Sequence, residues 1–242
     1  MIEPPRHAMV LAAGKGVRLR PITERVPKPL VKVGGRALID YALGALIATG
    51  VREAVVNAHY LPEAIEAFVA DFRRSHPALR LHLSREEALL ETGGGVVFAR
   101  GLLGGAPFYV LNSDVIVRDG ATPALLRLAQ MFDPARMDAL LLLQPVSRAV
   151  GYDGKGDYLL APDGRLISRS NEPSAPFVFT GAQILAPRLL DGAPEGAFSL
   201  KVLYDRAEAE RRLFGLVHDG AWLHIGTPDA LDLAERAIAA AS

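Results

Sequence analysis

Residues 8–32 read AMVLAAGKGVRLRPITERVPKPLVK, and this stretch decides how the rest of the chain is interpreted. Its apolar start, Ala8 to Ala12, predicts a short buried strand. Gly14-Lys15-Gly16 follows directly, and glycines after a strand let the backbone approach a ligand and turn its N–H groups toward phosphate. Arg18 and Lys28 add positive charge a few residues later. The stretch therefore predicts a site for a polyphosphate.

Two common phosphate loops do not fit this pattern. A P-loop needs a glycine five residues before a Gly-Lys pair, and the residues at those positions are Met9 and Ala149. A dinucleotide fingerprint needs a third glycine three residues after the second, and Leu19 stands there. The glycines of residues 14–16 taken alone are equally compatible with a plain strand-to-helix turn.

Composition excludes several classes of function. The chain has 242 residues, half of them apolar, with 27 basic and 27 acidic residues and therefore no net charge. This balance gives no reason to expect a nucleic-acid surface or a polybasic membrane segment. The chain has no cysteine, which removes disulfides and thiolate chemistry. No apolar run reaches the ~18 residues of a membrane span, so we expect a cytoplasmic protein that contacts no membrane.

Apolar periodicity predicts helices and strands that alternate over the first 146 residues. The expected helices are 38–49, 62–74, 95–103, 123–132, 200–211 and 228–240. The expected strands are 8–12, 53–57, 79–84, 108–111, 139–146, 158–160, 166–168, 177–184 and 213–218. Alternation of this kind predicts an α/β fold with a mostly parallel sheet covered by helices on both faces.

The chain changes character after residue 146. Residues 151–157 are rich in glycine, and Asp163-Gly164 between two short apolar runs is a hairpin signal. No linker separates the two parts, so we expect one domain over 1–242. Its residues 1–146 would form a nucleotide-binding half and its residues 147–242 a half for a second substrate.

The combination of motifs resembles a known family. Residues 11–23, with Leu-Ala-Ala-Gly-x-Gly-x-Arg-x-x-Pro-x-Thr, and residues 27–30, Pro-Lys-Pro-Leu, are similar to the signature of the sugar-phosphate nucleotidyltransferases. Within that family the chain looks most like bacterial N-acetylmuramate-1-phosphate uridylyltransferases. The resemblance implies a Rossmann-like, three-layer α/β/α fold with a mixed, mostly parallel sheet. It also implies an enzyme that joins a nucleoside triphosphate, most simply UTP, to a sugar 1-phosphate and releases pyrophosphate.

The resemblance assigns roles to the first loop. Arg18 would hold the leaving pyrophosphate, and Lys28 would neutralise the α-phosphate and the sugar phosphate. The residues expected to contact the nucleotide through this loop are Ala12, Ala13, Gly14, Lys15, Gly16 and Lys28. No general base is expected, because a phosphate monoester is already anionic.

A second glycine-rich element, Glu91-Thr92-Gly93-Gly94-Gly95, lies between an expected strand and an expected helix. By itself it is equally well a flexible turn. In the family a glycine-rich turn here borders the nucleobase, so Gly93 and Gly94 become candidate contacts. The same resemblance favours UTP or dTTP over purine nucleotides.

Polar residues follow the strand 108–111, where open α/β sheets place ligands. Asp114 there suits Mg²⁺, which prefers oxygen ligands and bridges phosphates, although the residue could equally cap the next segment. The resemblance makes Asp114 the metal-binding aspartate and Asn112 a contact to the sugar phosphate. Asp157, in a Gly-x-Gly-Asp-aromatic element, would bind sugar hydroxyls, or is simply a turn carboxylate.

The chain departs from the family at His224, where relatives usually carry a second metal-binding aspartate. His224 could touch Mg²⁺ through water or donate to a phosphate. It could instead bind a softer metal such as Mn²⁺ or Co²⁺ directly. It could also mark lost turnover, which would make the chain a sugar-nucleotide-binding regulator. The sugar, the base and the oligomeric state stay open, with other hexose or heptose 1-phosphates and dTTP, GTP or CTP as alternatives.

Overall fold

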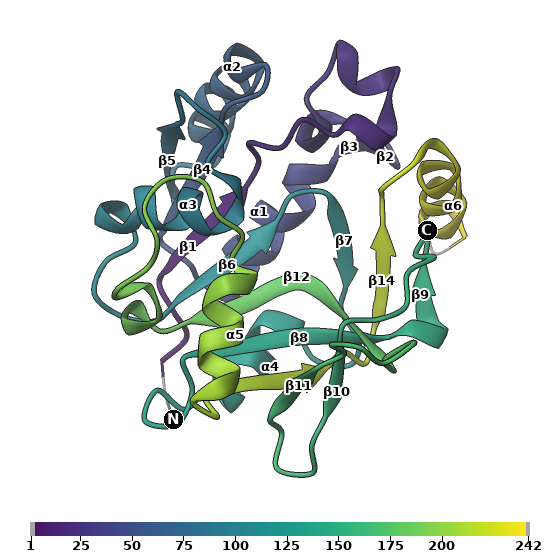
Figure 1. The fold of residues 1–242 in the computed structure, drawn as a ribbon. Coiled ribbons are helices and arrows are strands. Elements are labelled where there is room, and N and C mark those ends of the chain that lie inside the picture. The colour runs from purple at the N-terminus through teal and green to yellow at the C-terminus, as the bar shows by residue number, and fades with distance from the viewer. Residues whose placement is uncertain (1–2, 241–242) are drawn as a thin grey trace.

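The structure, a computed structural model, describes residues 3–240, and its centre is one mixed sheet (Figure 1). Nine strands of the described chain form this sheet. Their order along the main path is β11 (Leu166–Ser168), β10 (Tyr158–Leu160), β12 (Phe177–Leu185), β6 (Phe108–Asn112), β1 (His7–Leu11), β4 (Glu53–Ala58) and β5 (Arg80–Arg85). β8 (Ala139–Pro145) pairs with β12 and with β13 (Leu213–Val217) off this path.

The direction of the strands changes where the two parts of the chain meet. β1 is parallel to β4 and β6, and β4 is parallel to β5. β12 runs antiparallel to both β6 and β8. The sheet is therefore continuous across residue 146. The parallel strands β6, β1, β4 and β5 belong to the first half of the chain, and β13 of the second half pairs in parallel with β8.

Helices cover both faces of the sheet, which gives the expected three layers. Side chains alternate across β1, so Ala8 and Val10 belong to one core cluster and Met9 to another. The first face is covered by α1 (Leu38–Thr49), α2 (Pro62–Ser75) and α4 (Ala124–Met131). The opposite face is covered by α3 (Glu91–Phe98) and α5 (Lys201–Ala209). The α/β class and the layered arrangement predicted above are confirmed.

A smaller sheet stands beside the main one and was not predicted. It contains β7 (Val115–Arg118), β14 (Ala221–His224) and β9 (Ala149–Val150), and α6 (Pro228–Ala239) packs against it. A two-stranded ribbon, β2 (Lys32–Val33) with β3 (Arg36–Ala37), was also missed. These strands have two to four residues, too few to show alternation of apolar and polar residues.

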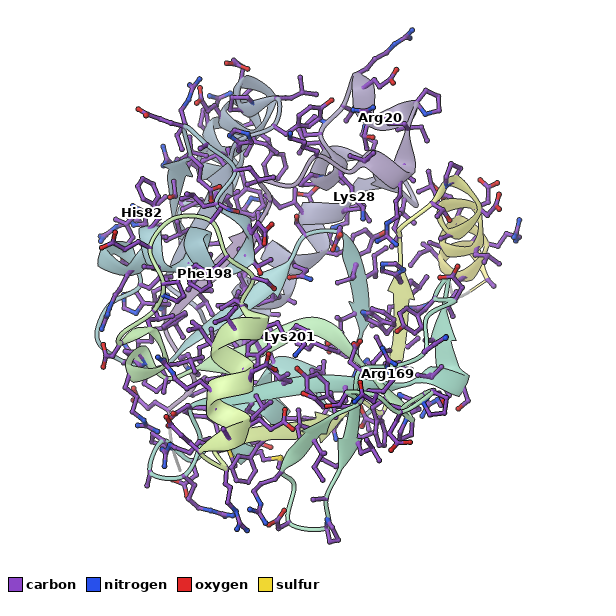
Figure 2. The ribbon with its side chains drawn as sticks, in the orientation of Figure 1. Arg20, Lys28, His82, Arg169, Phe198 and Lys201 are labelled. Carbon is purple, nitrogen blue, oxygen red and sulfur yellow. The ribbon has the colours of Figure 1, made fainter. Side chains whose placement is uncertain are left out.

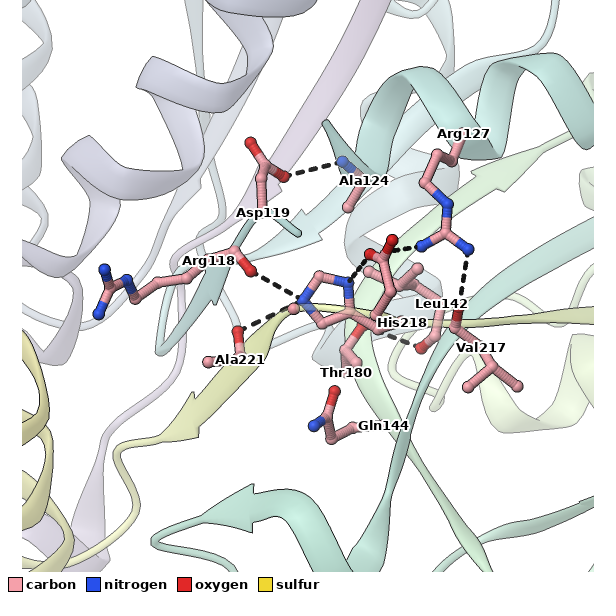
Figure 3. Close-up of polar contacts among 12 residues, drawn as sticks. Arg118, Asp119, Ala124, Arg127, Leu142, Gln144, Thr180, Val217, His218 and Ala221 are labelled. Carbon is pink, nitrogen blue, oxygen red and sulfur yellow. Dashed lines mark hydrogen bonds and ion pairs between the residues drawn. The ribbon is translucent and has the colours of Figure 1, made fainter. Parts of the chain in front are cut away.

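His218 connects the small sheet to the main one (Figure 3). Its backbone N–H donates to Leu143 O at 2.7 Å, and its Nε2 lies 3.0 Å from Arg118 O and 3.3 Å from Ala221 O. The side chain is fully buried, and burial lowers the pKa of the imidazole. Neutral His218 with its proton on Nε2 therefore ties β13 to the β7–β14 pair.

Most predicted elements are present with boundaries shifted by one or two residues, and α3 is the exception. The expected helix 95–103 instead begins at Glu91 and ends at Phe98, followed by a 3₁₀ turn over Arg100–Leu102. The glycines of the second motif are therefore inside the helix. Among residues 3–240, none of the helices combines the length and apolarity that a bilayer crossing requires.

Candidate active site

The loop after β1 exposes a run of backbone donors. Ala12 N–H is satisfied, because it donates to Asn57 Oδ1 at 2.6 Å. The next four N–H groups, those of residues 13–16, have no acceptor within the described chain. Successive unpaired N–H groups beside a cavity form the kind of concave donor set that binds phosphate oxygens.

Hydrogen bonds from Thr23 and Tyr60 fix the conformation of this loop. Gly16 has φ +60°, and a Cβ at this position would lie 3.0 Å from Lys28 Cβ and from Thr23 Cγ2. Buried Thr23 donates through Oγ1 to Gly16 O at 2.8 Å, and Tyr60 Oη donates to Thr23 O at 2.9 Å. Glycine is required at residue 16 because both its backbone angle and its surroundings exclude a side chain.

Lys28 and Asp114 form an ion pair beside this loop. Lys28 Nζ lies 2.8 Å from Asp114 Oδ2, with residue 28 only 8% exposed and the Asp114 side chain 36% exposed. Lys28 begins the 3₁₀ turn Lys28–Leu30, labelled at the upper part of Figure 2. The stem of Lys28 is buried, and its ammonium group is held against a carboxylate.

These groups border a cavity of about 490 Å³, the first cavity. It brings together eight of the predicted site residues: Ala12, Ala13, Gly14, Gly16, Arg18, Lys28, Asn112 and Asp114. Five others do not line it: Lys15, Gly93, Gly94, Asp157 and His224. The side chain of Lys15 is exposed to solvent. Only its backbone N–H belongs to the run of unpaired donors at residues 13–16.

Gly93 and Gly94 are committed to packing within the protein. Both N–H groups donate to Phe198 O, at 2.8 and 3.2 Å, the Phe198 ring packs against Gly93, and Gly196 O packs against Gly94. Their placement does not favour the predicted contacts to a nucleobase. The cavity wall at this point consists of Leu89, Glu91 and Thr92. Glu91 has φ +58°, an unusual conformation for a residue other than glycine, and it begins α3.

Asn57 is a cavity residue that the sequence interpretation did not include. It is buried at the end of β4, accepts from Ala12 N–H, and donates through Nδ2 to Glu86 Oε1 at 2.7 Å. Glu86, which is also buried, accepts from Leu90 N–H at 3.2 Å. The Asn57–Glu86 pair links the loop after β1 to the start of α3. Its sequence signal was the position of Asn57 at the carboxyl end of a parallel strand, the same position that identified Asn112.

His224 lies next to the first cavity rather than in its wall. It pairs across the small sheet with Val115, the residue after Asp114, and its Nδ1 is 3.2 Å from Gly151 O. Burial lowers the pKa of His224, so the ring is neutral at neutral pH. Within residues 3–240, no group of three or more His, Cys, Asp or Glu side chains is placed to hold a metal ion.

A second cavity of about 400 Å³ adjoins the first, with Leu11, Thr92, Asn112 and Ser199 lining both. Asp157 lies here and accepts from Phe179 N–H at 2.9 Å through Oδ2. Burial among the cavity walls raises the pKa of the Asp157 carboxyl, although the side chain stays open to the cavity. Predicted Asp157 and Asn112 are thus both on this side of the site.

A loop with unpaired N–H groups at the carboxyl end of a central parallel strand borders one cavity, and a second cavity adjoins it. The chain belongs to the nucleotidyl transferase family, whose sequence model matches residues 7–153. It is 40% identical over 242 residues to N-acetylmuramate alpha-1-phosphate uridylyltransferase of Caulobacter vibrioides, covering all of both chains. It is 34% identical over 222 residues to the Neisseria meningitidis enzyme of the same name, covering 91% of this chain and 93% of that one.

Solved structures show the same fold at low sequence identity. A UDP-glucose pyrophosphorylase in complex with UDP-glucose superposes with a TM-score of 0.79 at 15% identity, over the full length of both chains. An inositol-1-phosphate CTP transferase from T. maritima superposes with a TM-score of 0.76 at 17% identity, over 98% of this chain and 97% of that one. The chain is a nucleotidyltransferase with the fold of sugar-nucleotide enzymes.

Proposed function

We propose that this enzyme transfers UMP from UTP to N-acetylmuramate 1-phosphate, giving the UDP-sugar and pyrophosphate. The observation that carries the proposal is the first cavity, where unpaired N–H groups of residues 13–16 lie beside Arg18 and the Lys28–Asp114 pair. The names of the two full-length relatives supply the substrate.

The chemistry is an in-line attack of a sugar-phosphate oxygen on the α-phosphorus of UTP. Such a reaction depends on positioning and on neutralising charge. The N–H groups of Gly14 and Gly16 bind the triphosphate, and Arg18 holds the leaving pyrophosphate. Lys28 turns from Asp114 to the α-phosphate and the incoming phosphate.

Mg²⁺ fits the donor set of the first cavity. Mg²⁺ commonly takes one or two carboxylates together with substrate phosphates and water. Asp114 offers one carboxylate. Its Oδ2 accepts from Lys28 Nζ, and its Oδ1 has no protein partner among the described residues. When bound there, the ion would neutralise phosphate charge and orient the triphosphate.

Neutral His224 supports a role through water or toward a phosphate rather than as a direct Mg²⁺ ligand. Its Nδ1 is already at hydrogen-bond distance from Gly151 O, and imidazole prefers softer metals. Rates with Mg²⁺, Mn²⁺ and Co²⁺ for the parent and for His224→Asp test this. We expect turnover with Mg²⁺ in both; a parent active with Mn²⁺ or Co²⁺ alone would make His224 a direct ligand.

The second half of the chain supplies most of the sugar side, and Asn112 is a contribution from the first half. Asn112 borders both cavities and suits the sugar phosphate, and Asp157 suits sugar hydroxyls. This division assigns residues 1–146 to the nucleotide and residues 147–242 to the sugar within one domain.

The test is pyrophosphate release with four nucleoside triphosphates against a panel of sugar 1-phosphates. We expect UTP with N-acetylmuramate 1-phosphate to give the highest kcat/KM. Faster turnover of another sugar 1-phosphate or of a purine nucleotide would show that the substrates differ from those proposed. The type of reaction would remain the same. If no pair of substrates gives pyrophosphate release with any metal, the result would favour a sugar-nucleotide-binding regulator.

A further inference from the structure

The second cavity contains more cationic groups than a neutral sugar requires. Residues of β12, the β10–β11 hairpin and the start of α5 line it, and it shares four lining residues with the first cavity. If the proposed function holds, a sugar 1-phosphate whose phosphate reaches Lys28 extends into this space. The remaining side chains of the cavity then decide which sugar is accepted.

Gln183 shows that the cavity is built to hold a polar ligand. The residue is fully buried on β12 and lines the cavity. Tyr204 Oη donates to its Oε1 at 2.7 Å, which fixes the amide, and its Nε2 has no acceptor within residues 3–240. A buried donor without a partner is costly, so a ligand oxygen is its natural acceptor.

Arg169 presents a charge that no carboxylate of the described chain neutralises by direct pairing. Its Nε donates to Gly156 O at 3.0 Å and its Nη1 to Glu172 O at 2.9 Å, both of them backbone carbonyls. These bonds hold the guanidinium in place, and Nη2 has no acceptor among the described residues. A guanidinium with positioned, unused donors is well suited to a carboxylate.

Lys201 adds a second cation from another element. It is the first residue of α5 and lines the same cavity, close to the positive end of the helix (Figure 2). Its Nζ contacts Asp205 one turn along, but both side chains are more than half exposed, and such a pair is weak and readily exchanged. Lys201 can therefore turn to a ligand at little cost.

Carboxylates near the second cavity limit its net positive charge, among them Glu208, which accepts from Ser168 of the cavity wall. Asp157 faces the same cavity, and Asp205 borders Lys201. Asp157 accepts from Phe179 N–H, and Arg169 and Lys201 attract its carboxylate through space without a direct contact in the described chain. The cations on the cavity wall thus remain available to a second anion.

We propose that Arg169 and Lys201 recognise a carboxylate carried by the sugar, with Gln183 donating to a neutral oxygen of the same ring. N-acetylmuramate is N-acetylglucosamine bearing a lactyl ether, and the free carboxylate of that ether is the group in question. The sugar phosphate is not the ligand of this pair, because it must reach the first cavity, which neither cation lines. Arg169 and Lys201 are therefore specificity residues rather than catalytic ones.

The test compares the UDP derivatives of N-acetylmuramate and N-acetylglucosamine, which share the entire nucleotide. Titration calorimetry on the parent, Arg169→Gln and Lys201→Gln gives both affinities, and turnover of the two sugar 1-phosphates gives a second measure. Arg52→Gln and Lys32→Gln are matched controls, since both residues are exposed and neither lines either cavity.

We expect Arg169→Gln to weaken the muramate compound by ~10- to 100-fold, the scale for a hydrogen bond to a charged group, and Lys201→Gln to have a smaller effect. The glucosamine compound should change by less than ~3-fold, and Arg169→Lys should recover part of the loss. UTP affinity, unchanged in every variant, confirms that they fold.

Suppose that the parent turns over N-acetylmuramate 1-phosphate. Equal losses of affinity for both UDP-sugars in the variants, or no loss for either, would then overturn the inference. A parent that binds the muramate compound no better than the glucosamine compound would overturn it as well. A parent that does not use N-acetylmuramate 1-phosphate at all would instead refute the proposed function, and this inference with it.

Discussion

The two cavities are built differently. In the first, one continuous stretch supplies both the unpaired backbone N–H groups of residues 13–16 and buried Lys28, and Lys28 contacts Asp114 just past the end of the neighbouring strand. The second is formed by side chains from separate segments: Asp157, Arg169, Gln183 and Lys201. A site for a common group such as triphosphate can use backbone donors, whereas a site that selects among sugars needs side chains. We expect substitutions in the first to affect every substrate and those in the second to affect particular sugars.

Lys28→Ala should produce the largest effect, a loss of turnover of at least ~10²-fold with every sugar 1-phosphate, because it removes a positioned charge at the reacting phosphates. Steady-state kinetics measure it, with exposed Lys32→Ala as the control. The fold should survive because Asp114, 36% exposed, can be hydrated. Near-parental rates, or a loss confined to one sugar, would contradict the role of Lys28.

Asp114→Asn should remove most of the Mg²⁺ dependence of turnover, because the amide keeps the shape and loses the charge that holds a hard cation. The measurement is rate against Mg²⁺ concentration, with exposed Asp153→Asn as the control. If the Mg²⁺ requirement of Asp114→Asn matches that of the parent, Asp114 is not a direct ligand.

Gly181→Ala tests the boundary between the cavities. Gly181 has φ +87° at an irregularity of β12, and an added Cβ would lie 2.8 Å from the side chain of Asn112. Gly35 has φ +75° with no atom within 4 Å of its Cβ position. Gly35→Ala should cost about 1–2 kcal/mol of unfolding free energy from backbone strain alone.

Gly181→Ala should cost more in unfolding free energy than Gly35→Ala and should also raise KM for the sugar 1-phosphate by displacing Asn112. Urea unfolding and kinetics on both variants measure this difference. Equal effects of the two substitutions would mean that the position of Asn112 does not matter to the sugar side.

The smallest effect concerns pH and lies outside both cavities. Burial lowers the pKa of His218 below its ordinary value of 6.5, despite the two carbonyls at Nε2 and Asp219 at 4.0 Å from Nδ1. Below pH 6.5 the unfolded chain therefore binds a proton that the folded chain resists, so stability falls as pH falls.

We expect the free energy of unfolding to decrease below pH 6.5 by at most ~1.4 kcal/mol per pH unit for this histidine. His218→Gln should show a shallower slope, and the exposed control His76→Gln should keep the parental slope. Parallel pH profiles for the parent and His218→Gln would show that His218 does not titrate in this way.

The sequence predicted those parts of the fold whose signals are local. Helix α1 matches the expected range because its apolar stripe ends at Gly50, which has φ +86°. The β10–β11 hairpin matches because Asp163-Gly164 marks its turn. α3 was misplaced because three successive glycines do not favour a helix. Long-range bonds from Gly93 and Gly94 to Phe198 O hold its first turns.

The candidate site also has one part that local sequence signals indicated and another part that they did not. That Gly14, Gly16, Arg18 and Lys28 share one cavity was predictable because they are close in sequence. The Asn57–Glu86 link was not, because its importance depends on the distance of 2.7 Å between side chains 29 residues apart. Arg169 and Lys201 have no motif of their own, and only the packing of α5 beside the β10–β11 hairpin brings them to one cavity.

The central claim is that a sugar-phosphate oxygen attacks the α-phosphorus of UTP in the first cavity. N-acetylmuramate 1-phosphate labelled with ¹⁸O in its phosphate, incubated with enzyme and UTP and followed by ³¹P NMR, tests it directly. We expect all of the label to stay in the UDP-sugar, with one labelled oxygen between the two phosphorus atoms and none in pyrophosphate. Label in pyrophosphate, or no labelled UDP-sugar, would contradict it.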